Sequence, residues 1–453
     1  MFGLGPAFKG GIRLPAPERR ADEARVRQLA FAPLLVLPLR QHAGAAAVAV
    51  VRPGEEVLRG QLLARAEDPT GVPLHAPATG RILRISERGD GDGGTVRVIE
   101  LAPLPGDTQE DPGGRRLDPE HCSADELLAA IGETGLVGLG GEAQSTHLRL
   151  VRARERGASV LVINGIEGEP GFSRVPAVLA GHGKALLSGL RCLGKLLGTP
   201  QTVLAVEQRD GAAAQAMLAA AADGLRPVLQ VLAPRYPQGA AELLLRALGG
   251  RSRAGQRRFA ADQAVVFSLA TVAELGRLIS GGLAMTDQLL SLAGDGLREP
   301  GNYRVPLGTP VGFALQQAGV QAGLDRVLAG GPMRGQAMAA LDRPIVKGAT
   351  GFVAVAGADV SGDVSDRREP MPCIRCGECV AACPLELHPA ELGLLARRGE
   401  VQAMVSDWHL ERCFECGCCA YVCPSHIPLV QMFRAAKLQW RRSQSVTVGE
   451  GAA

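Results

Sequence analysis

The sequence predicts a multidomain protein, in which β and α/β domains are followed by a small α-helical module built around cysteines. Three observations lead to this prediction. The chain has 453 residues, enough for about three or four domains. Its middle part alternates continuous apolar runs with helical segments, as parallel α/β sheets do, and short turn-bounded strands lie on both sides. Two cysteine runs lie near the carboxyl end.

Residues 1–30 are expected to form an extended N-terminal arm with a passive role. The stretch FKGGIRLPAPE contains Gly10 and Gly11, which favour a turn, and two prolines, which stiffen the chain. The apolar core of MFGLGPAFKGG is too short for a signal peptide. No run of about 18 apolar residues follows, so we expect a cytosolic chain without a transmembrane segment of its own.

Residues 31–103 alternate short strands with turns and are predicted to form a barrel-sandwich hybrid domain. The phrases RPGEEVLRGQLLARA and VPLHAPATGRI resemble lipoyl and biotinyl carrier domains. Those carriers hold a lysine at a hairpin tip, but the tip near Asp68–Gly71 has none. We therefore expect a scaffold without a prosthetic group, in which His75 is a packed histidine at a strand edge. Residues 104–124 are rich in Pro, Gly and Asp and are expected to form a linker.

Residues 125–258 are predicted to form an α/β domain of the nucleotide-binding type. The apolar runs SVLVING, TVLAVEQ and LRPVLQVL indicate buried parallel strands, with helical segments between them. The glycine-rich turn of Gly138, Gly140 and Gly141 is suited to cradle a phosphate with its backbone N–H groups. The same turn also fits an ordinary connection between a strand and a helix, so both interpretations stay open.

Residues 260–360 are expected to be β-rich, as a small β-grasp (SLBB-like) domain with a connector. AVVFSLATVAEL has the pattern of a strand that runs into a helix. The turn-rich stretches NYRVPLGTPVGFALQQAG and RVLAGGPMRGQAM follow, and VKGATGFVAVAG has the pattern of a closing hairpin.

Residues 365–435 contain two cysteine runs, CIRCGECVAACP and CFECGCCAYVCP, both with the spacing C-x2-C-x2-C-x3-C-P. Thiolates at this spacing hold three corners of a cubane [4Fe–4S] cluster, and the fourth cysteine ligates the other cluster. The helical segment between the runs predicts an α-helical ferredoxin-like module. The spacing assigns one cluster to Cys373, Cys376, Cys379 and Cys423, and the second to Cys413, Cys416, Cys419 and Cys383.

Structural zinc and disulfides are the alternatives for these cysteines. Zinc sites favour pairs of cysteines from two separate knuckles over four in one run before a proline, and disulfides need an oxidising compartment. Cys418 breaks the spacing and is predicted to be unligated. Cys122 and Cys192 are interpreted as buried structural thiols. Residues 436–453 are expected to be a short polar tail without fixed structure.

Charge excludes one class of partner. The formal net charge is +3, nearly balanced, so the chain lacks the basic excess of a nucleic-acid-binding protein. Aromatic residues make up 3% of the chain, while there are 59 glycines and 30 prolines, which indicates many tight turns rather than one large helical bundle.

Taken together, the motifs resemble the RnfC (RsxC) family, the C component of the Rnf (Rsx) electron-transport complex. They are FKGGI, the barrel sandwich, GLVGLGG, VINGIEGEP, YPQGA, LGTP, GGPM, VKGATG and the two cysteine runs. The resemblance implies a peripheral protein on the cytoplasmic side of the cell inner membrane, bound to integral membrane and ferredoxin-like subunits. It implies electron transfer between NADH or ferredoxin and the membrane subunits, coupled to ion translocation. The implied cofactors are two [4Fe–4S] clusters and FMN.

The middle part is also similar to the flavin-bearing, NADH-oxidising subunit of respiratory complex I. An acidic loop with the pattern N-x-x-E-x-E-P is kept. The flavin loop of relatives, GGAGFPTxxK, stands here as GGEAQSTHLR. The resemblance assigns FMN and NADH binding to Gly138, Gly140, Gly141, Arg149, Asn164, Glu167 and Glu169.

Departures in the flavin loop bear on whether it binds a flavin. Ala143 replaces a glycine, and the aromatic residue and the proline of the pattern are missing from Glu142–Ser145. Glu142 adds a negative charge near the place of a flavin phosphate, unless its side chain points away. Arg149 stands at the lysine position, and Arg174 stands where relatives have an acidic residue. The loop is therefore either a working flavin site or a degenerate turn retained for packing.

Three functions remain open from the sequence. In the first, the chain takes electrons from NADH through FMN and passes them singly through its clusters to the membrane subunits. In the second, the flavin fold is vestigial, and the chain is a non-enzymatic relay and docking subunit that binds no FMN or NADH. In the third, weaker interpretation, it is a dehydrogenase subunit with an unrelated acceptor.

Overall fold

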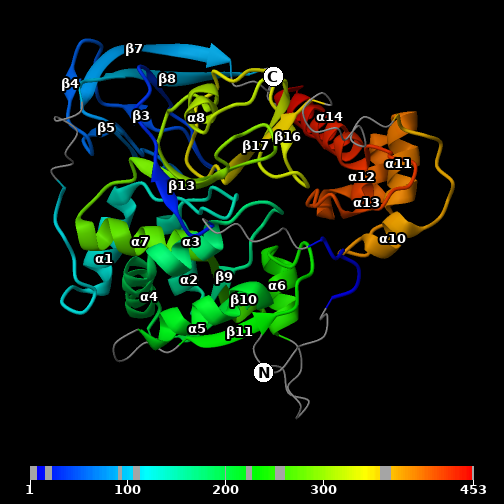
Figure 1. The fold of residues 1–453 in the computed structure, drawn as a ribbon, viewed down its shortest axis with the longest axis horizontal. Helices are drawn as coiled ribbons and strands as arrows, with labels where there is room; N and C mark the ends of the chain where they lie inside the picture. The colour runs from blue at the N-terminus through cyan, green and yellow to red at the C-terminus, as the bar shows by residue number, and fades with distance from the viewer. Residues whose placement is uncertain are drawn as a thin grey trace.

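The computed structural model describes residues 8–15, 23–89, 94–105, 113–198, 200–220, 227–249, 261–357 and 369–450. Parts of the predicted arm, linker, domain junctions and tail lie outside these ranges. Three parts are visible (Figure 1). A β-rich part lies at the top of the view, an α/β part lies below it, and a helical module lies to one side.

The N-terminal domain is the predicted barrel sandwich, with two antiparallel sheets. One sheet has the order β2-β8-β7-β4, and the other β3-β5-β6. Side chains that are fully buried between them, such as those of Leu63, Ile82 and Leu101, form the core. The strands are β2 Leu35–Pro38, β3 Val48–Ala49, β4 Glu56–Val57, β5 Leu62–Arg65, β6 Leu74–His75, β7 Gly80–Gly89 and β8 Thr95–Pro103.

The α/β part is built on a parallel sheet with the order β11-β10-β9-β12. Its strands are β9 Val160–Gly165, β10 Gln201–Glu207, β11 Val228–Leu232 and β12 Ala264–Ser268. Its helices are α1 Ala124–Thr134, α2 Thr146–Glu155, α3 Arg174–Gly181, α4 Gly183–Leu197, α5 Gly211–Ala219, α6 Ala241–Leu248 and α7 Leu269–Gly281, with short 3-10 turns at Gln208–Asp210 and Ala261–Gln263.

The predicted boundary between residues 258 and 260 is wrong. The segment AVVFSLATVAEL forms β12 and α7, and β12 pairs in parallel with β9 of the α/β sheet. Helices α4 and α7 pack closely because Gly189 and Gly276 lie at their contact. A Cβ at Gly276 would overlap the carbonyl oxygen of Ala185. The α/β part therefore continues to Gly281, and the next sheet begins after it.

The third domain is a six-stranded sheet with the order β1-β14-β13-β17-β15-β16. The first of these strands comes from the predicted arm, so that segment is not only an extended connection: it adds a parallel edge strand to β14. The elements are β1 Val26–Gln28, β13 Asp287–Ala293, β14 Gly301–Pro306, α8 Val311–Gln317, β15 Leu324–Ala329, β16 Gln336–Ala337 and β17 Gly351–Ala356.

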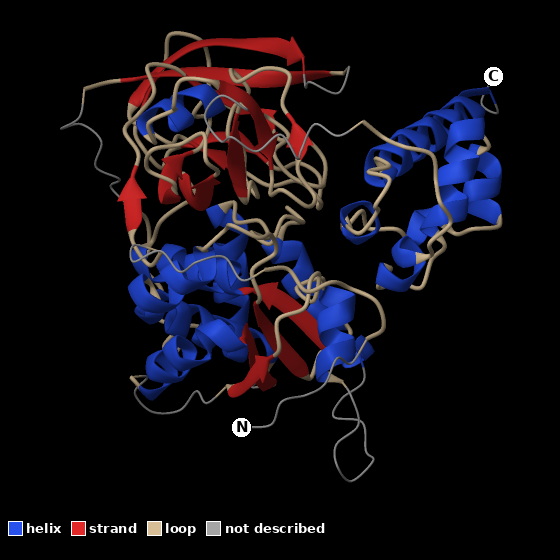
Figure 2. Ribbon diagram, turned by 45° about the vertical axis from the view of Figure 1, so that its right-hand side comes forward, coloured by secondary structure: helices blue, strands red, loops and turns tan. Residues whose placement is uncertain are grey.

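The C-terminal module is helical, as predicted, and Figure 2 shows it beside the strand-rich parts. Its elements are α10 Glu378–Ala382, α11 Pro389–Arg398, α12 Val401–Ser406, the 3-10 turn Leu410–Arg412, α13 Cys418–Tyr421 and α14 Leu429–Glu450. Helix α14 corrects the prediction of an unstructured tail from residue 436, because its apolar side packs on the module, where Phe433 and Ala436 are buried. None of the described helices combines the length and apolarity that crossing a bilayer requires.

A buried lysine of the VKGATG motif, in the six-stranded sheet domain, connects that domain to the barrel sandwich and to the α/β part. Nζ of Lys347 donates to the carbonyl oxygens of Pro73 and Gly135, each at 2.7 Å. Its backbone N–H donates to Gln41. Burial lowers the pKa of Lys347 to about 7. The lysine therefore satisfies two carbonyl groups that would otherwise be buried without donors.

A buried ion network also crosses these parts. Asp287 of β13 lies 2.9 Å from Arg59 of the barrel sandwich, 3.2 Å from Arg277 of α7 and 2.6 Å from Arg304 of β14. Glu274 of α7 pairs with Arg277 and Arg304. Burial alone would raise the pKa of Asp287, but the arginines outweigh it and hold the pKa below its usual value. A carboxylate with three cationic partners is costly to remove from such a setting.

We predict that Asp287→Asn lowers the free energy of unfolding near neutral pH by about 3–5 kcal/mol, because it removes one of the two carboxylates that offset the charges of the partly buried Arg59, Arg277 and Arg304. The folded-state pKa of Asp287 lies below the usual 3.8, so the stabilisation is present above that pH and is lost as pH falls through the lowered value. Urea denaturation at neutral and acid pH measures both effects. Asp125→Asn, at an exposed ion pair with Arg154, is the control. Equal losses in the two variants would contradict the role of the network.

Candidate functional site

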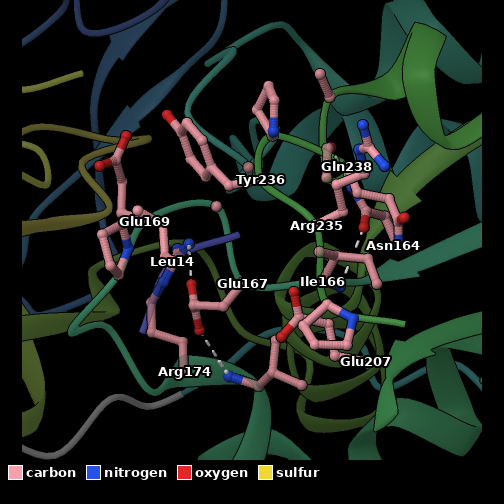
Figure 3. A pocket seen from close by; sticks show the side chains of 18 of the residues that line it. Leu14, Asn164, Ile166, Glu167, Glu169, Arg174, Glu207, Arg235, Tyr236 and Gln238 are labelled. Atoms are coloured by element: carbon pink, nitrogen blue, oxygen red, sulfur yellow. Dashed lines mark hydrogen bonds and ion pairs between the residues drawn. The ribbon is translucent and has the colours of Figure 1, made fainter. Parts of the chain in front are cut away.

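A pocket lies at the carboxyl ends of the parallel strands β9, β10 and β12. Asn164 lies near the end of β9, residues 166–170 follow that strand, Glu207 ends β10 and Ser268 ends β12, and all of these contribute to the lining. Ligands of open α/β sheets bind outside the carboxyl ends of the strands. The lining also includes Leu14 and Pro15 of the N-terminal arm and Arg334 of the six-stranded sheet domain. Figure 3 shows the side chains around this pocket.

Three helices begin at the pocket. Arg174 and Val175 open α3, Ala240 precedes α6, and Ser268 caps α7 by accepting a hydrogen bond from the backbone N–H of Thr271. A helix N-terminus presents unpaired N–H groups and a partial positive charge, which favours anions. The pocket is therefore suited to a ligand that carries phosphate groups.

The acidic loop with the pattern N-x-x-E-x-E-P lines one side of the pocket. Oδ1 of Asn164 accepts from the backbone N–H of Ile166, and its amide donates to the carbonyl oxygen of Gly239 at 2.8 Å. Glu167 accepts from the backbone N–H of Val175 at 3.1 Å. These two side chains hold the loop after β9 against the segments that enter α6 and α3.

Glu169 and Glu207 are two titratable groups of the lining, and burial raises the pKa of both. Oε2 of Glu169 accepts from the backbone N–H of Met333 at 3.0 Å, while its Oε1 is buried without a hydrogen-bond partner in the described part of the chain. Burial raises the pKa of Glu169 to about 7. The side chain is thus able to hold or release a proton at the edge of the pocket near neutral pH.

Arg174 occupies the position where relatives have an acidic residue. Its guanidinium donates to the carbonyl oxygen of Leu139 at 2.9 Å and lies 3.4 Å from Glu167 (Figure 3). Its Nε is buried without a partner in the described residues. Together with the open Oε1 of Glu169, this atom shows that the pocket has polar groups left for a ligand or water. A phosphate-bearing group such as FMN therefore fits the chemistry of the lining.

The glycine-rich loop reaches the pocket through one residue, Gly140. Gly138 and Gly141 are absent from the lining, and Gly138 donates to the carbonyl oxygen of Gln144. Arg149 is also turned away: it lies 2.9 Å from Glu142 and stacks over the ring of Phe267 at 4.6 Å. The structure thus gathers Gly140, Asn164, Glu167 and Glu169, and it places Gly138, Gly141 and Arg149 behind them.

The Glu142–Arg149 ion pair determines whether the charge of Glu142 would repel a bound flavin phosphate. Glu142 points to Arg149, so its negative charge is offset rather than presented to a bound phosphate. Ala143 adopts a left-handed conformation with φ 48°, which an alanine tolerates only at some cost. The missing glycine therefore changes local strain, while the lining itself contains no atom of Ala143.

Several lining residues carry no signal that the sequence alone could have shown. Arg235 precedes the YPQGA segment that enters α6, Tyr236 is the first residue of that segment, and Arg334 lies in the GGPMRG turn of another domain. Their approach to the pocket depends on how the domains pack. Only the YPQGA and GGPM motifs, which belong to the family resemblance, pointed to these segments.

Nine of the 11 cysteines lie in the helical module. Four of them line one cavity of the helical module: Cys373, Cys376, Cys379 and Cys423. Cys419 has Cys416, Cys413 and Cys383 as electrostatic neighbours, and also Cys379 of the first predicted set. Within the described ranges, no three His, Cys, Asp or Glu side chains converge on a single metal ion. In a cubane cluster each thiolate binds a different iron, so its ligands surround the cluster and do not meet at one point.

Of the three remaining cysteines, Cys418 lies beside the predicted ligand Cys416, and the other two lie outside the helical module. Cys418 is fully buried, and its Sγ faces the carbonyl oxygen of Tyr236 at 3.9 Å. Cys122 and Cys192 are buried in the main core. Burial raises the pKa of the Cys192 thiol to about 12, as for an inert structural thiol.

Three family descriptions match parts of this chain. The RnfC barrel sandwich hybrid domain matches residues 6–103. The Nuo51 FMN-binding domain matches residues 131–277, a range that includes β12 and most of α7. The 4Fe-4S dicluster domain matches residues 372–427.

Similar proteins cover nearly the whole chain. The C component of the ion-translocating oxidoreductase complex of Rhodobacter capsulatus is 30% identical over 443 residues, which are 97% of this chain and 84% of that protein. The protein of the same name from Pseudomonas aeruginosa is 34% identical over 97% of this chain and 56% of its own length. The C component of the proton-translocating ferredoxin:NAD(+) oxidoreductase complex of Clostridium ljungdahlii is 28% identical over 89% of this chain and 87% of its own length.

Among solved structures, an NAD+-reducing [NiFe]-hydrogenase in the air-oxidized state is similar, with a TM-score of 0.47 and 18% identity. The similarity covers 71% of this chain and 64% of that one.

We predict that protonation of Glu169 stabilises the fold. Its folded-state pKa, about 7, lies above the ordinary 4.5, so the stabilisation is full below pH 4.5 and is lost as pH rises through about 7. Glu169→Gln has no titrating carboxyl group, but its side chain can still accept the hydrogen bond from Met333. Between acid and alkaline pH, its free energy of unfolding should therefore rise by roughly 2–3 kcal/mol relative to that of wild type. Urea midpoints of the ligand-free protein at several pH values measure this difference, with Glu242→Gln at an exposed position as control. A pH profile parallel to that of wild type would show that Glu169 is ionised throughout.

Proposed function

We propose a function for this chain from the premise that it belongs to the RnfC family of ion-translocating (Rnf) oxidoreductase complexes. The chain relays electrons between NADH or ferredoxin and the membrane subunits of such a complex, and the electron flow is coupled to ion translocation. It acts as one part of an enzyme complex. The observation that carries this proposal is the joint presence of a phosphate-suited pocket and two interlocked cysteine sets in one chain.

Two [4Fe–4S] clusters account for the cysteine sets. One cluster is held by Cys373, Cys376, Cys379 and Cys423, and the other by Cys413, Cys416, Cys419 and Cys383. When bound, FMN supplies the conversion between a two-electron hydride donor and one-electron carriers, and the clusters supply one-electron transfer. Cys418 donates to a carbonyl group and ligates no iron.

The residues of the pocket have distinct parts in this proposal. Gly140, the helix N-termini and Arg174 bind the anionic groups of FMN or NADH. Asn164 and Glu167 orient the loop after β9. Glu169 holds or releases a proton at the pocket. Arg149 acts from behind the lining, with Gly138 and Gly141, by keeping Glu142 away from the phosphate site.

The proposed location is the cytoplasmic side of the cell inner membrane, where integral membrane and ferredoxin-like subunits hold the chain. Two observations support attachment through partners. The net charge of +3 is too small for a broadly basic surface that would bind acidic lipids, and no described helix has the length and apolarity to span a bilayer.

Anaerobic purification followed by metal and flavin analysis tests the proposal. We expect about eight irons and one flavin per chain, and bleaching of the cluster absorbance when NADH is added. Eight irons without flavin and without an NADH response would instead support a relay subunit with a degenerate flavin site. A protein that holds zinc in place of iron would overturn the proposal.

We predict that Cys379→Ala abolishes one cluster and destabilises the other, because each cysteine run supplies a ligand to both. Iron content should fall by about half or more, with a matching loss of visible absorbance. The control is Cys418→Ala, at a buried thiol of the second run that is predicted to ligate no iron, and this variant should keep the iron content of wild type. Full iron in Cys379→Ala, or iron loss in Cys418→Ala, would show that the ligand assignment is wrong.

A further inference from the structure

The N-terminal arm lies between the pocket and the second cysteine set. We call residues Phe8–Leu14 the strap. Ile12 forms a backbone bridge with Tyr236: its N–H donates to the Tyr236 carbonyl oxygen at 2.8 Å, and the N–H of Tyr236 donates back at 2.9 Å. On its other side, the N–H of Gly11 donates to the carbonyl oxygen of Ala382 at 2.9 Å. Ala382 directly precedes the cluster ligand Cys383.

Both glycines of the strap lie so close to neighbouring backbone that a larger residue would not fit. Gly10 and Gly11 each have φ +70°, a conformation that costs other residues about 1–2 kcal/mol. A Cβ at Gly10 would overlap the carbonyl oxygen of Cys383, and a Cβ at Gly11 would lie 2.7 Å from the carbonyl oxygen of Tyr236. One glycine thus lets the strap touch a cluster ligand, and the other lets it touch the pocket loop.

Side-chain contacts also hold the N-terminal half of the strap. Arg235 of the pocket loop donates to the carbonyl oxygen of Gly10, and its guanidinium lies 5.3 Å from the centre of the Phe8 ring. Phe8 is buried among Leu243 of α6 and Leu385 of the helical module. The strap is therefore packed between two domains and is not a loose terminus.

Two further contacts join the pocket to the same cysteine run. The hydroxyl of Tyr236, which lines the pocket, donates to the carbonyl oxygen of Cys416 at 2.6 Å. Met333, whose N–H binds Glu169, lies with its carbonyl group so close to Gly417 that a Cβ there would be about 2.5 Å from the oxygen. Three separate backbone segments therefore hold the second cysteine set against the pocket.

The first cysteine set, in contrast, lies partly at the protein surface. Cys373 and Cys376 are exposed, and Ile374 between them is 68% exposed. The described residues thus place one cysteine set against the pocket and the other at the surface of the module.

We propose that the strap is a positioning element that fixes the cluster of Cys413, Cys416, Cys419 and Cys383 at the pocket, so that this cluster exchanges electrons with the pocket before the exposed cluster does. This inference rests on the proposed function, because it assumes that the pocket takes electrons from NADH. Oxidation of one NADH to NAD+ and a proton releases two electrons, and each cluster takes up one. Gly10 and Gly11 of the strap do not line the pocket, and they act through the distance between the two sites.

Gly10→Ala tests the strap, because the added methyl must push the cluster-ligand segment away from the pocket loop. We expect iron content and reduction by dithionite, which acts from solution, to remain as in wild type. Bleaching by NADH should become slower on the order of tenfold or more, since small displacements between reacting groups are costly. Hydrogen exchange should rise in the segments 235–240 and 416–422.

The matched control is Gly198→Ala. Gly198 also has φ +70°, but no heavy atom lies within 4 Å of a Cβ built there, so the variant adds the same backbone strain without the clash. Tyr236→Phe, which removes the hydrogen bond to Cys416 at nearly constant volume, is a second test in case Gly10→Ala fails to fold. It should raise hydrogen exchange in the segment 416–422.

Rates and exchange that match the Gly198→Ala control in both test variants would overturn the proposal. If wild type itself shows no bleaching by NADH, the proposed function fails. The exchange measurements still decide whether the strap holds the module to the pocket.

Discussion

Close backbone contact between the pocket loops and the second cysteine run is the constraint on which the rest of the structure depends. Electron transfer requires that the sites exchanging electrons lie close together, but here the pocket and the cysteine sets lie in different domains. The chain meets this need with glycines at the contact points: Gly10 against Cys383, Gly11 against Tyr236 and Gly417 against Met333. Where no side chain intervenes, main chains touch directly, and hydrogen bonds from Gly11, Ile12 and Tyr236 fix their separation.

The contact between the pocket loops and the second cysteine run also requires that the other domains hold the pocket in a fixed shape. The pocket is lined by the α/β part, the N-terminal arm and a turn of the six-stranded sheet domain, so it keeps its shape only if those parts keep their places. The network around Asp287 and the hydrogen bonds of Lys347 supply this, because both sit at junctions and both would be costly if left incomplete. The barrel sandwich then serves as a scaffold that orients the sheet domain and its Met333 turn.

Much of the fold could be predicted from sequence, because local patterns specify it. Apolar runs identified β9, β10 and β11, and cysteine spacing identified the helical module. The domain to which β12 and α7 belong could not be predicted, since a strand followed by a helix looks alike in either domain and the choice depends on pairing with β9. The length of α14 was missed because polar residues dominate its surface while Phe433 and Ala436 anchor one side.

In the candidate site too, a sequence motif was enough to place some residues, while others are placed by tertiary contacts. Asn164, Glu167 and Glu169 follow one strand, so a local motif was enough to place them. Arg149 stood at the position of a ligand lysine, but its pairing with Glu142 and its stacking on Phe267 are tertiary contacts that no spacing reveals. The role of the arm was likewise hidden, because its partners Tyr236 and Cys383 are more than two hundred residues away.

Anomalous diffraction from anaerobically grown crystals, recorded at the iron and zinc absorption edges, tests the central claim most directly. The account predicts two iron peaks in the helical module, of which the one surrounded by Cys413, Cys416, Cys419 and Cys383 lies nearer to Tyr236 and the pocket. A zinc peak at either position, or an iron peak next to the pocket that is ligated by Cys373 and Cys376, would contradict it.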